Sequence, residues 1–76
     1  MTMNSFLAER SRFFRSRQRH PNKVTLHPSD RADLLLVLKS HELQWDDQGR
    51  EVIAGATVYD SKSQDVGRAR FELEER

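Results

Sequence analysis

The stretch that decides the fold is Pro-Ser-Asp-Arg-Ala-Asp-Leu-Leu-Leu-Val-Leu-Lys-Ser-His-Glu-Leu-Gln-Trp, residues 28–45, the only long and strongly apolar segment of the chain. Pro28 interrupts whatever element precedes it, and Ser29 or Asp30 can accept a hydrogen bond from the first free amides of a helix. Asp33 adds negative charge in the first turn, where the helix dipole favours it. The pattern therefore predicts a central helix over residues 28–45.

The apolar side chains of this helix cover more than one of its faces. At about 100° per residue, one broad face holds Leu34, Val37, Leu38, His41 and Trp45. Leu35 and Leu36 point elsewhere. A helix that is apolar over most of its circumference is covered on more than one side. We therefore expect a sheet against one face and a second element against the other.

Length and composition bound the class of protein. Seventy-six residues make one small domain, and the absence of cysteine excludes disulfides and thiolate metal sites. No apolar run approaches the roughly 18 residues that a membrane span needs. The first thirty residues contain five arginines and no uninterrupted apolar core of a signal peptide. We expect a cytoplasmic protein, in the host cytoplasm if it is viral.

Charge divides the chain into two parts. Residues 1–23 carry six Lys or Arg side chains against one Glu, a net charge of +5. Residues 24–76 carry seven Lys or Arg against eleven Asp or Glu, a net charge of −4. Such a split favours two separate roles. We predict a basic amphipathic helical arm over residues 1–21 and a small body over residues 22–76.

The arm is predicted to be a helix over residues 6–18, capped by Asn4 or Ser5 and ended before Pro21. Its apolar side holds Met3, Phe6, Leu7, Phe13 and Phe14, with Arg10 and Arg17 in the middle of the same side. Arg12, Arg15 and Arg19 lie roughly opposite. The helix is thus basic all round, with an aromatic stripe.

Three segments of the body read as strands. Residues 23–27 alternate, with Val24 and Leu26 on one side, and residues 52–59 are rich in β-branched side chains. Residues 66–73 alternate again, and a polar turn before them predicts an antiparallel hairpin with residues 52–59. The expected fold is α+β and two-layered, with the order α-β-α-β-β and a small antiparallel sheet packed on the central helix.

The sequence contains none of the common catalytic motifs. The three glycines are far apart, and His20, His27 and His41 lack the spacing of helical metal ligands. Asp46, Asp47 and Glu51 bracket a glycine turn but lack the alternating oxygen ligands of an EF-hand loop. We therefore expect no enzyme, no metal and no cofactor.

Trp45 and the arm are the remaining candidates for function. We expect Trp45 in the core, because a tryptophan at the end of an apolar helix usually covers the sheet; if exposed, it would anchor an interface. For the arm we expect a protein partner, either another protein or a second copy in a homo-oligomer. Nucleic acid, bound through phosphates, is the alternative, and a membrane surface is the least favoured. The predicted partner-binding residues are Phe6, Arg10, Arg12, Phe13, Phe14, Arg15, Arg17 and Arg19.

The uncovered leucines predict where the arm packs. Burying a leucine side chain is worth about 1.5–3 kcal/mol, so leaving Leu35 and Leu36 exposed would cost much of a small domain's stability. We expect Phe6, Phe13 and Phe14 to lie across this second face of the central helix. The arginines opposite them would then form an outward basic surface.

Three segments carry a family resemblance: His-Pro-Ser-Asp-Arg-Ala-Asp-Leu-Leu (27–35), Ile-Ala-Gly-Ala-Thr-Val (53–58) and Val-Gly-Arg-Ala-Arg-Phe (66–71). They resemble short uncharacterised proteins of tailed bacteriophages, over about fifty residues and in small, common side chains. The proline usual before the last glycine is replaced by Val66. The resemblance implies a phage or prophage origin and no particular activity. Small phage proteins of this kind commonly act by binding, as inhibitors of host machinery, anti-defence proteins or minor virion components.

Overall fold

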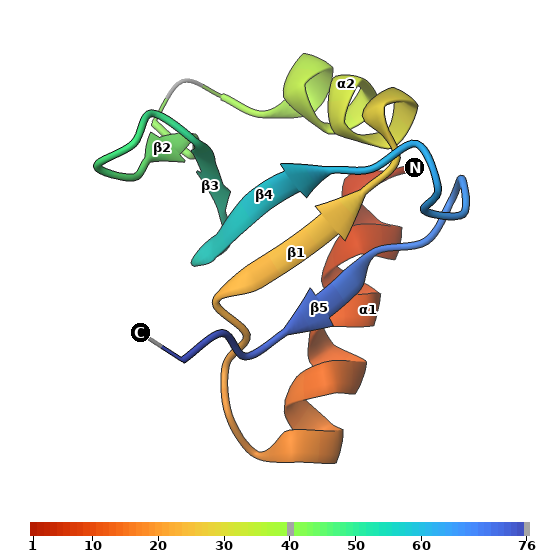
Figure 1. Ribbon diagram of the computed structural model, residues 1–76. Helices are drawn as coiled ribbons and strands as arrows, with labels where there is room; N and C mark the ends of the chain where they lie inside the picture. The colour runs from red at the N-terminus through yellow and green to blue at the C-terminus, as the bar shows by residue number, and fades with distance from the viewer. Residues whose placement is uncertain (40, 76) are drawn as a thin grey trace.

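A computed structural model describes residues 1–39 and 41–75, which form two helices and a five-stranded sheet (Figure 1). The α+β class is confirmed, but two further strands make the order α-β-α-β-β-β-β. The elements are α1 (Met3–Arg17), β1 (Lys23–Leu26), α2 (Pro28–Val37), β2 (Gln44–Trp45), β3 (Glu51–Ile53), β4 (Ala56–Asp60) and β5 (Arg70–Glu72).

The sheet is mixed, with the strand order β2-β3-β4-β1-β5. β1 lies between two later strands: Val24 stands opposite Val58 of the parallel strand β4 and opposite Phe71 of the antiparallel strand β5. The hairpin predicted between residues 52–59 and 66–73 is therefore wrong. These segments flank β1 on its two sides, because both bury apolar side chains beside Val24.

The predicted strand 52–59 is itself a hairpin, formed by β3 and β4. Ala54 and Gly55 connect the strands with φ angles of 51° and 82°. A two-residue turn with positive φ at both positions matches the twist of the flanking strands. Arg10 of α1 donates from Nε to the Ala54 carbonyl oxygen at 3.0 Å, which ties the turn to the first helix.

The central helix is shorter than predicted. α2 ends at Val37, and Leu38 has extended backbone angles; Ser40 lies outside the described residues. Residues 44–45 pair with β3 instead of continuing the helix, which leaves Trp45 60% exposed on the edge strand β2. The core position expected for Trp45 is therefore wrong. His27, and neither Ser29 nor Asp30, caps the helix by accepting the Ser29 amide at 3.1 Å.

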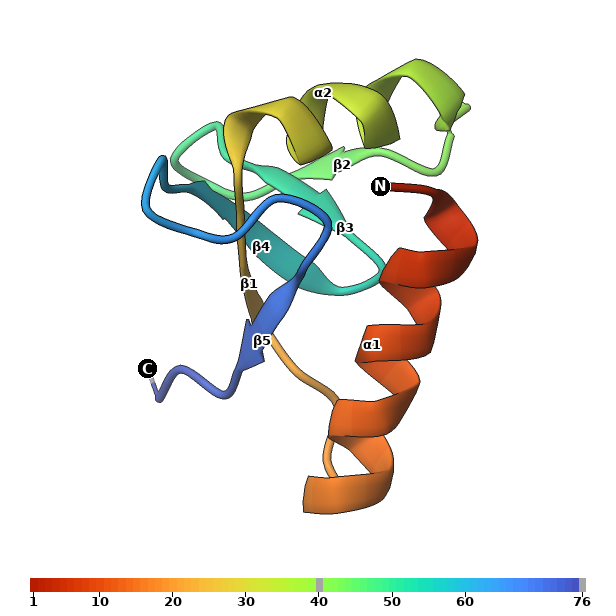
Figure 2. The same cartoon turned by 90° about the vertical axis from the view of Figure 1, so that its right-hand side faces the viewer.

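The hydrophobic core lies on one face of the sheet. Both helices contribute to it, and α1 runs along this face while α2 crosses one end of the sheet (Figure 2). Its fully or nearly fully buried members are Phe6, Val24, Leu26, Leu34, Ile53, Ala56, Val58 and Phe71. Alternation along the strands sends Lys23, Thr25 and Tyr59 to the opposite face, which we call the open face.

α1 packs on the sheet and leaves the outer side of α2 uncovered. The Phe6 ring is fully buried, with its centroid 5.1 Å from that of Phe71. Leu36 is 84% exposed and Val37 is 61% exposed. The predicted contact of the aromatic stripe with Leu35 and Leu36 is therefore wrong, since Phe71 offers the larger apolar partner.

The start of α1 is fastened in two ways. The Thr2 hydroxyl oxygen, and not that of Asn4 or Ser5, caps the helix by accepting the Ser5 amide at 3.1 Å. The Met1 ammonium group lies 2.9 Å from an Asp33 oxygen and 3.1 Å from an oxygen of the buried Asp30. Hydrogen bonds to Asp33 and then Asp30 raise the pKa of this amino group above its ordinary value of 8.0.

Candidate functional site

The exposed side of α1 and the turn that follows it carry a cluster of cations, which we call the α1 basic surface: Arg12, Arg15, Arg17 and Arg19. All four are exposed, and the outward orientation predicted for Arg12, Arg15 and Arg19 is confirmed. Gln18 ends the helix in the left-handed region at φ 57°, and its amide donates to the Phe14 carbonyl oxygen at 2.6 Å. Arg15 and Arg17 thus project from the last turn of the helix, and Arg19 projects from the turn that follows it.

Two of the predicted partner-binding residues belong to the fold and not to this surface. Phe6 is fully buried and so cannot reach a partner, which makes its assignment wrong. Arg10 is only partly exposed, and its guanidinium already binds the Ala54 carbonyl oxygen and the His20 ring at 3.2 Å. It joins α1 to the β3–β4 turn.

The other two aromatic side chains lie on the same helix as most of the surface arginines. Phe13 and Phe14 are each partly buried. The Arg17 guanidinium lies 5.4 Å from the centroid of the Phe13 ring, a cation–π distance. The Phe14 ring stacks on His20 with a centroid separation of 4.5 Å. The surface therefore combines guanidinium groups with half-covered rings, as protein interfaces often do.

The charges of the α1 basic surface are only partly compensated within the chain. Glu9 lies 3.7 Å from Arg12 and 2.9 Å from Arg68, and its carboxylate also accepts the Ala69 amide. Among residues 1–39 and 41–75, no carboxylate oxygen lies within ion-pair distance of Arg15, Arg17 or Arg19. Three guanidinium groups are thus left for an external anion.

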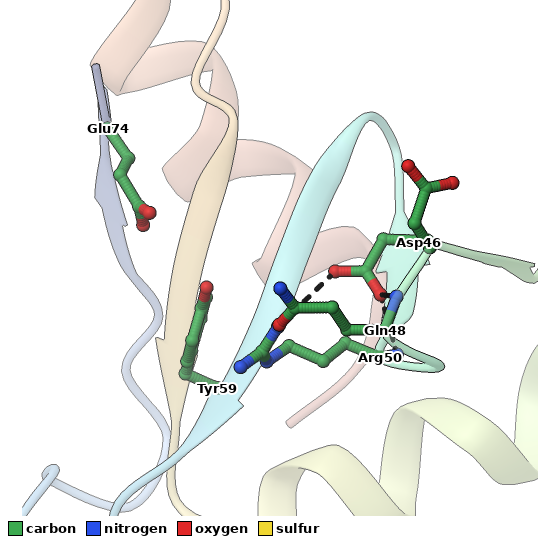
Figure 3. A pocket seen from close by; sticks show the side chains of 6 residues that line it. Asp46, Gln48, Arg50, Tyr59 and Glu74 are labelled. Atoms are coloured by element: carbon green, nitrogen blue, oxygen red, sulfur yellow. Dashed lines mark hydrogen bonds and ion pairs between the residues drawn. The ribbon is translucent and has the colours of Figure 1, made fainter. Parts of the chain in front are cut away.

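The open face has a polar hollow of about 550 Å³, lined by Asp46, Asp47, Gln48, Arg50, Tyr59 and Glu74. In Figure 3, Arg50 extends toward Tyr59, and Glu74 faces them from the segment after β5. Lys23 and Arg50 lie 4.8 Å and 5.1 Å from the Tyr59 ring centroid. Sequence reasoning missed this grouping, although the alternation of residues 23–27 placed Lys23 outward.

The polar groups of this hollow already bind one another. Arg50 contacts Gln48 and lies 3.7 Å from Asp46, and Lys23 lies 3.8 Å from Glu74. Asp46 accepts the Arg50 amide at 2.8 Å and the Gln48 amide at 2.9 Å, and the Arg50 bond is the main cause of its lowered pKa. Asp46 thus organises a tight turn, and of the four charged residues that line the hollow, Asp47 alone has no ion pair among the described residues.

The remaining histidines and acids form no metal centre in the part of the chain that the structure describes. His27 caps α2, and His41 is exposed in the turn after it. Within the described residues, neither helix has the length and apolar character needed to cross a bilayer.

Comparison of the chain with protein-family models, with curated proteins and with solved structures gave no match. The fold and surface therefore define the class: a small α+β domain with a basic helix fixed to its core.

Proposed function

We propose that this protein is a non-enzymatic binding module that recognises an acidic surface of another protein through the α1 basic surface. The observation that carries the proposal is that Arg15, Arg17 and Arg19 are exposed without a carboxylate partner among the described residues, next to a helix that is fixed to the core. Because Phe6 and Glu9 hold α1 on the sheet, little backbone entropy is lost when these arginines bind, and the entropic cost is that of ordering their side chains.

Guanidinium chemistry favours a protein partner. A guanidinium forms paired hydrogen bonds to a carboxylate, and its weak hydration suits it to interfaces. Phe13 adds apolar area directly beneath Arg17, and the partly buried Phe14 adds more on the same helix. The exposed Trp45 on β2 is a second possible anchor, since exposed tryptophans dominate many interfaces.

The phage resemblance supports a biological setting for this proposal. A small phage protein that binds without catalysis would act as an inhibitor of host machinery, an anti-defence protein or a minor virion component. The host cytoplasm would then be its place of action.

The test is capture from a nuclease-treated bacterial lysate by the immobilised full-length protein. We expect the wild type to retain a protein that Arg15→Glu/Arg19→Glu loses. Lys39→Glu/Lys62→Glu is the matched control, because it makes the same change in net charge at two exposed lysines that lie outside α1 and β5. Capture that survives the α1 substitutions, or is lost equally with the control, would refute the assignment.

Nucleic acid is the alternative partner, and the same unpaired guanidinium groups favour it. Four phosphate contacts, one for each arginine of the surface, would give a log–log salt dependence with a slope of about −3 to −4 on duplex DNA. Gel retardation of duplex DNA and of RNA at low salt distinguishes the two partners. No retardation at low salt removes this alternative and leaves the protein partner.

A further inference from the structure

β5 forms one edge of the sheet, and among the described strands it pairs only with β1 (Figure 2). An edge strand presents unpaired amides and carbonyls that can pair with another chain, and proteins block such edges with proline, with charged side chains or by keeping the strand short. β5 is three residues long and contains no proline, and its two charged residues, Arg70 and Glu72, have opposite signs. Charged side chains oppose pairing with a second copy where like charges meet, so the register decides whether they protect this edge.

The backbone directions show which groups this edge offers. The Glu72 carbonyl oxygen accepts the Asn22 amide at 3.2 Å, and the backbone of Glu74 exchanges two hydrogen bonds with the Asn22 side chain. Residues 72 and 74 therefore direct their backbone groups toward β1. Because these directions alternate along a strand, Phe71 and Leu73 direct theirs to the outer edge.

The side chains of β5 are self-complementary about Phe71. In an antiparallel pair with a two-fold axis at Phe71, Arg70 of each copy stands opposite Glu72 of the other. Both side chains are accessible for this exchange, at 67% and 36% exposure, and at present they pair within the strand at 3.1 Å. Opposite charges directly across a strand pair are stabilising, and like charges are destabilising.

The neighbouring two-fold registers that keep the same face inward each set two like charges against one another at the axis. An axis at Arg70 places Arg70 opposite itself, and an axis at Glu72 places Glu72 opposite itself. A parallel pair in register also opposes like charges at both positions. A shift by one residue would place the core face of the partner's sheet beside the open face of the first copy. Of these registers, only the axis at Phe71 sets both Arg70 and Glu72 opposite a residue of the other sign.

The helix-side surface next to this edge also has room for a partner. A groove of about 250 Å³ lies between α1 and β5, with Phe13 and Phe71 among its lining residues. In the Phe71-centred register, the partner's Leu73 stands opposite Ala69, beside this groove. The Ala69 amide already donates to Glu9, so the Leu73 amide and the Ala69 carbonyl carry the bond there.

We propose that the protein forms a two-fold dimer in which β5 pairs antiparallel with β5 of a second copy, centred on Phe71. The Phe71 amide and carbonyl of each copy bind those of the other, and the Leu73 amide of each donates to the Ala69 carbonyl of the other. The two sheets join into one, and the two open faces become continuous. This dimer does not depend on the partner proposed for the α1 basic surface.

The test is sedimentation analysis of the full chain up to about 1 mM, with charge variants of β5. We expect the wild type to approach twice its monomer mass of 8.9 kDa. Arg70→Glu and Glu72→Arg, each alone, should weaken the dimer by at least about tenfold, because each puts two like-charged pairs at the interface. An equimolar mixture of the two variants should form a heterodimer, in which every cross-strand pair is again of opposite sign.

The double variant Arg70→Glu/Glu72→Arg is the matched control. It keeps the composition of the wild type and the pairing within the strand, and it restores both cross-strand pairs, so it should dimerise like the wild type. Circular dichroism checks that the single variants remain folded. A wild type that stays monomeric, single variants that dimerise unchanged, or a mixture that stays monomeric would each overturn the proposal. Reversing Arg15 and Arg19 should leave the dimer intact, which keeps this result separate from partner capture.

Discussion

Replacing Phe6 with alanine tests whether α1 belongs to the fold or is an appended arm. Phe6 is fully buried against Phe71, and removing a buried phenylalanine ring costs about 3–5 kcal/mol. At about 0.05–0.15 kcal/mol per residue, a chain of 76 residues has a total stability of about 4–11 kcal/mol. Phe6→Ala should therefore remove between about a quarter and all of the free energy of unfolding.

The assay is urea denaturation followed by far-UV circular dichroism, at one protein concentration for all variants. With a urea m-value of about 1–2 kcal/mol/M, Phe6→Ala should lower the midpoint by about 2 M or leave the chain unfolded in water. Leu7→Ala is the matched control, because Leu7 is the next residue of the same helix and is 42% exposed. Its cost should be about 1 kcal/mol. Equal midpoints for the two variants would show that α1 does not share the core.

Three further predictions concern α2 and the polar contacts. Leu34→Ala should cost about 2–5 kcal/mol of unfolding free energy, because the Leu34 side chain is fully buried. Leu36→Ala should change it by about 0.5 kcal/mol or less, because Leu36 is 84% exposed. Equal urea midpoints for the two variants would contradict the uncovered outer side of α2. Arg31→Met should lower the free energy of unfolding by about 1–3 kcal/mol, since it leaves the partly buried Glu51 carboxylate without its guanidinium partner. In thermal melts, Arg31→Met/Glu51→Met should recover part of this lost stability. Because the pKa of Asp46 is lowered from 3.8 by the Arg50 amide, its stabilisation is present above about pH 3.8 and is lost as the pH falls below it. The melting-temperature difference between wild type and Asp46→Asn should therefore shrink in strong acid, and a pH-independent difference would contradict this account.

The sequence predicted elements whose cause is local, and it failed where the cause is a distant contact. The strand at Lys23 and the start of α2 at Pro28 follow from alternation and from proline chemistry. The end of α2 at Val37 has no local signal, because neither glycine nor proline follows closely and the apolar spacing continues to Trp45. The pairing of Gln44 and Trp45 with β3 outweighs that spacing.

The turn at Ala54 is a second place where a distant contact, and not the local sequence, decides the structure. Positive φ is uncommon for alanine, so residues 52–59 read as one strand. The hydrogen bond from Arg10 to the Ala54 carbonyl oxygen, 44 residues apart, helps to hold the turn.

For the candidate site, composition predicted the basic surface but could not separate its members. Arg10 and Arg17 occupy the same predicted side of the helix, yet Arg10 is bonded to a turn while Arg17 is exposed. Phe6 and Phe13 likewise share one side and differ in burial. Helical spacing gives the direction of a side chain and not the shape of what it meets, which here is set by Phe71 and Ala54.

The position of β1 in the sheet has a consequence for how the chain matures during translation. β1 is synthesised before all other strands, yet both strands that flank it, β4 and β5, come later in the chain. Until Phe71 has left the ribosome, β1 has at least one unpaired edge, and Phe6 lacks the ring on which it packs. Such nonlocal pairings form slowly and expose apolar strands while they are incomplete. The nascent protein therefore cannot complete its sheet or bury Phe6 on Phe71 until β5 has been made, so a ribosome stalled before β5 would hold a fragment with exposed apolar side chains and an unpaired strand edge.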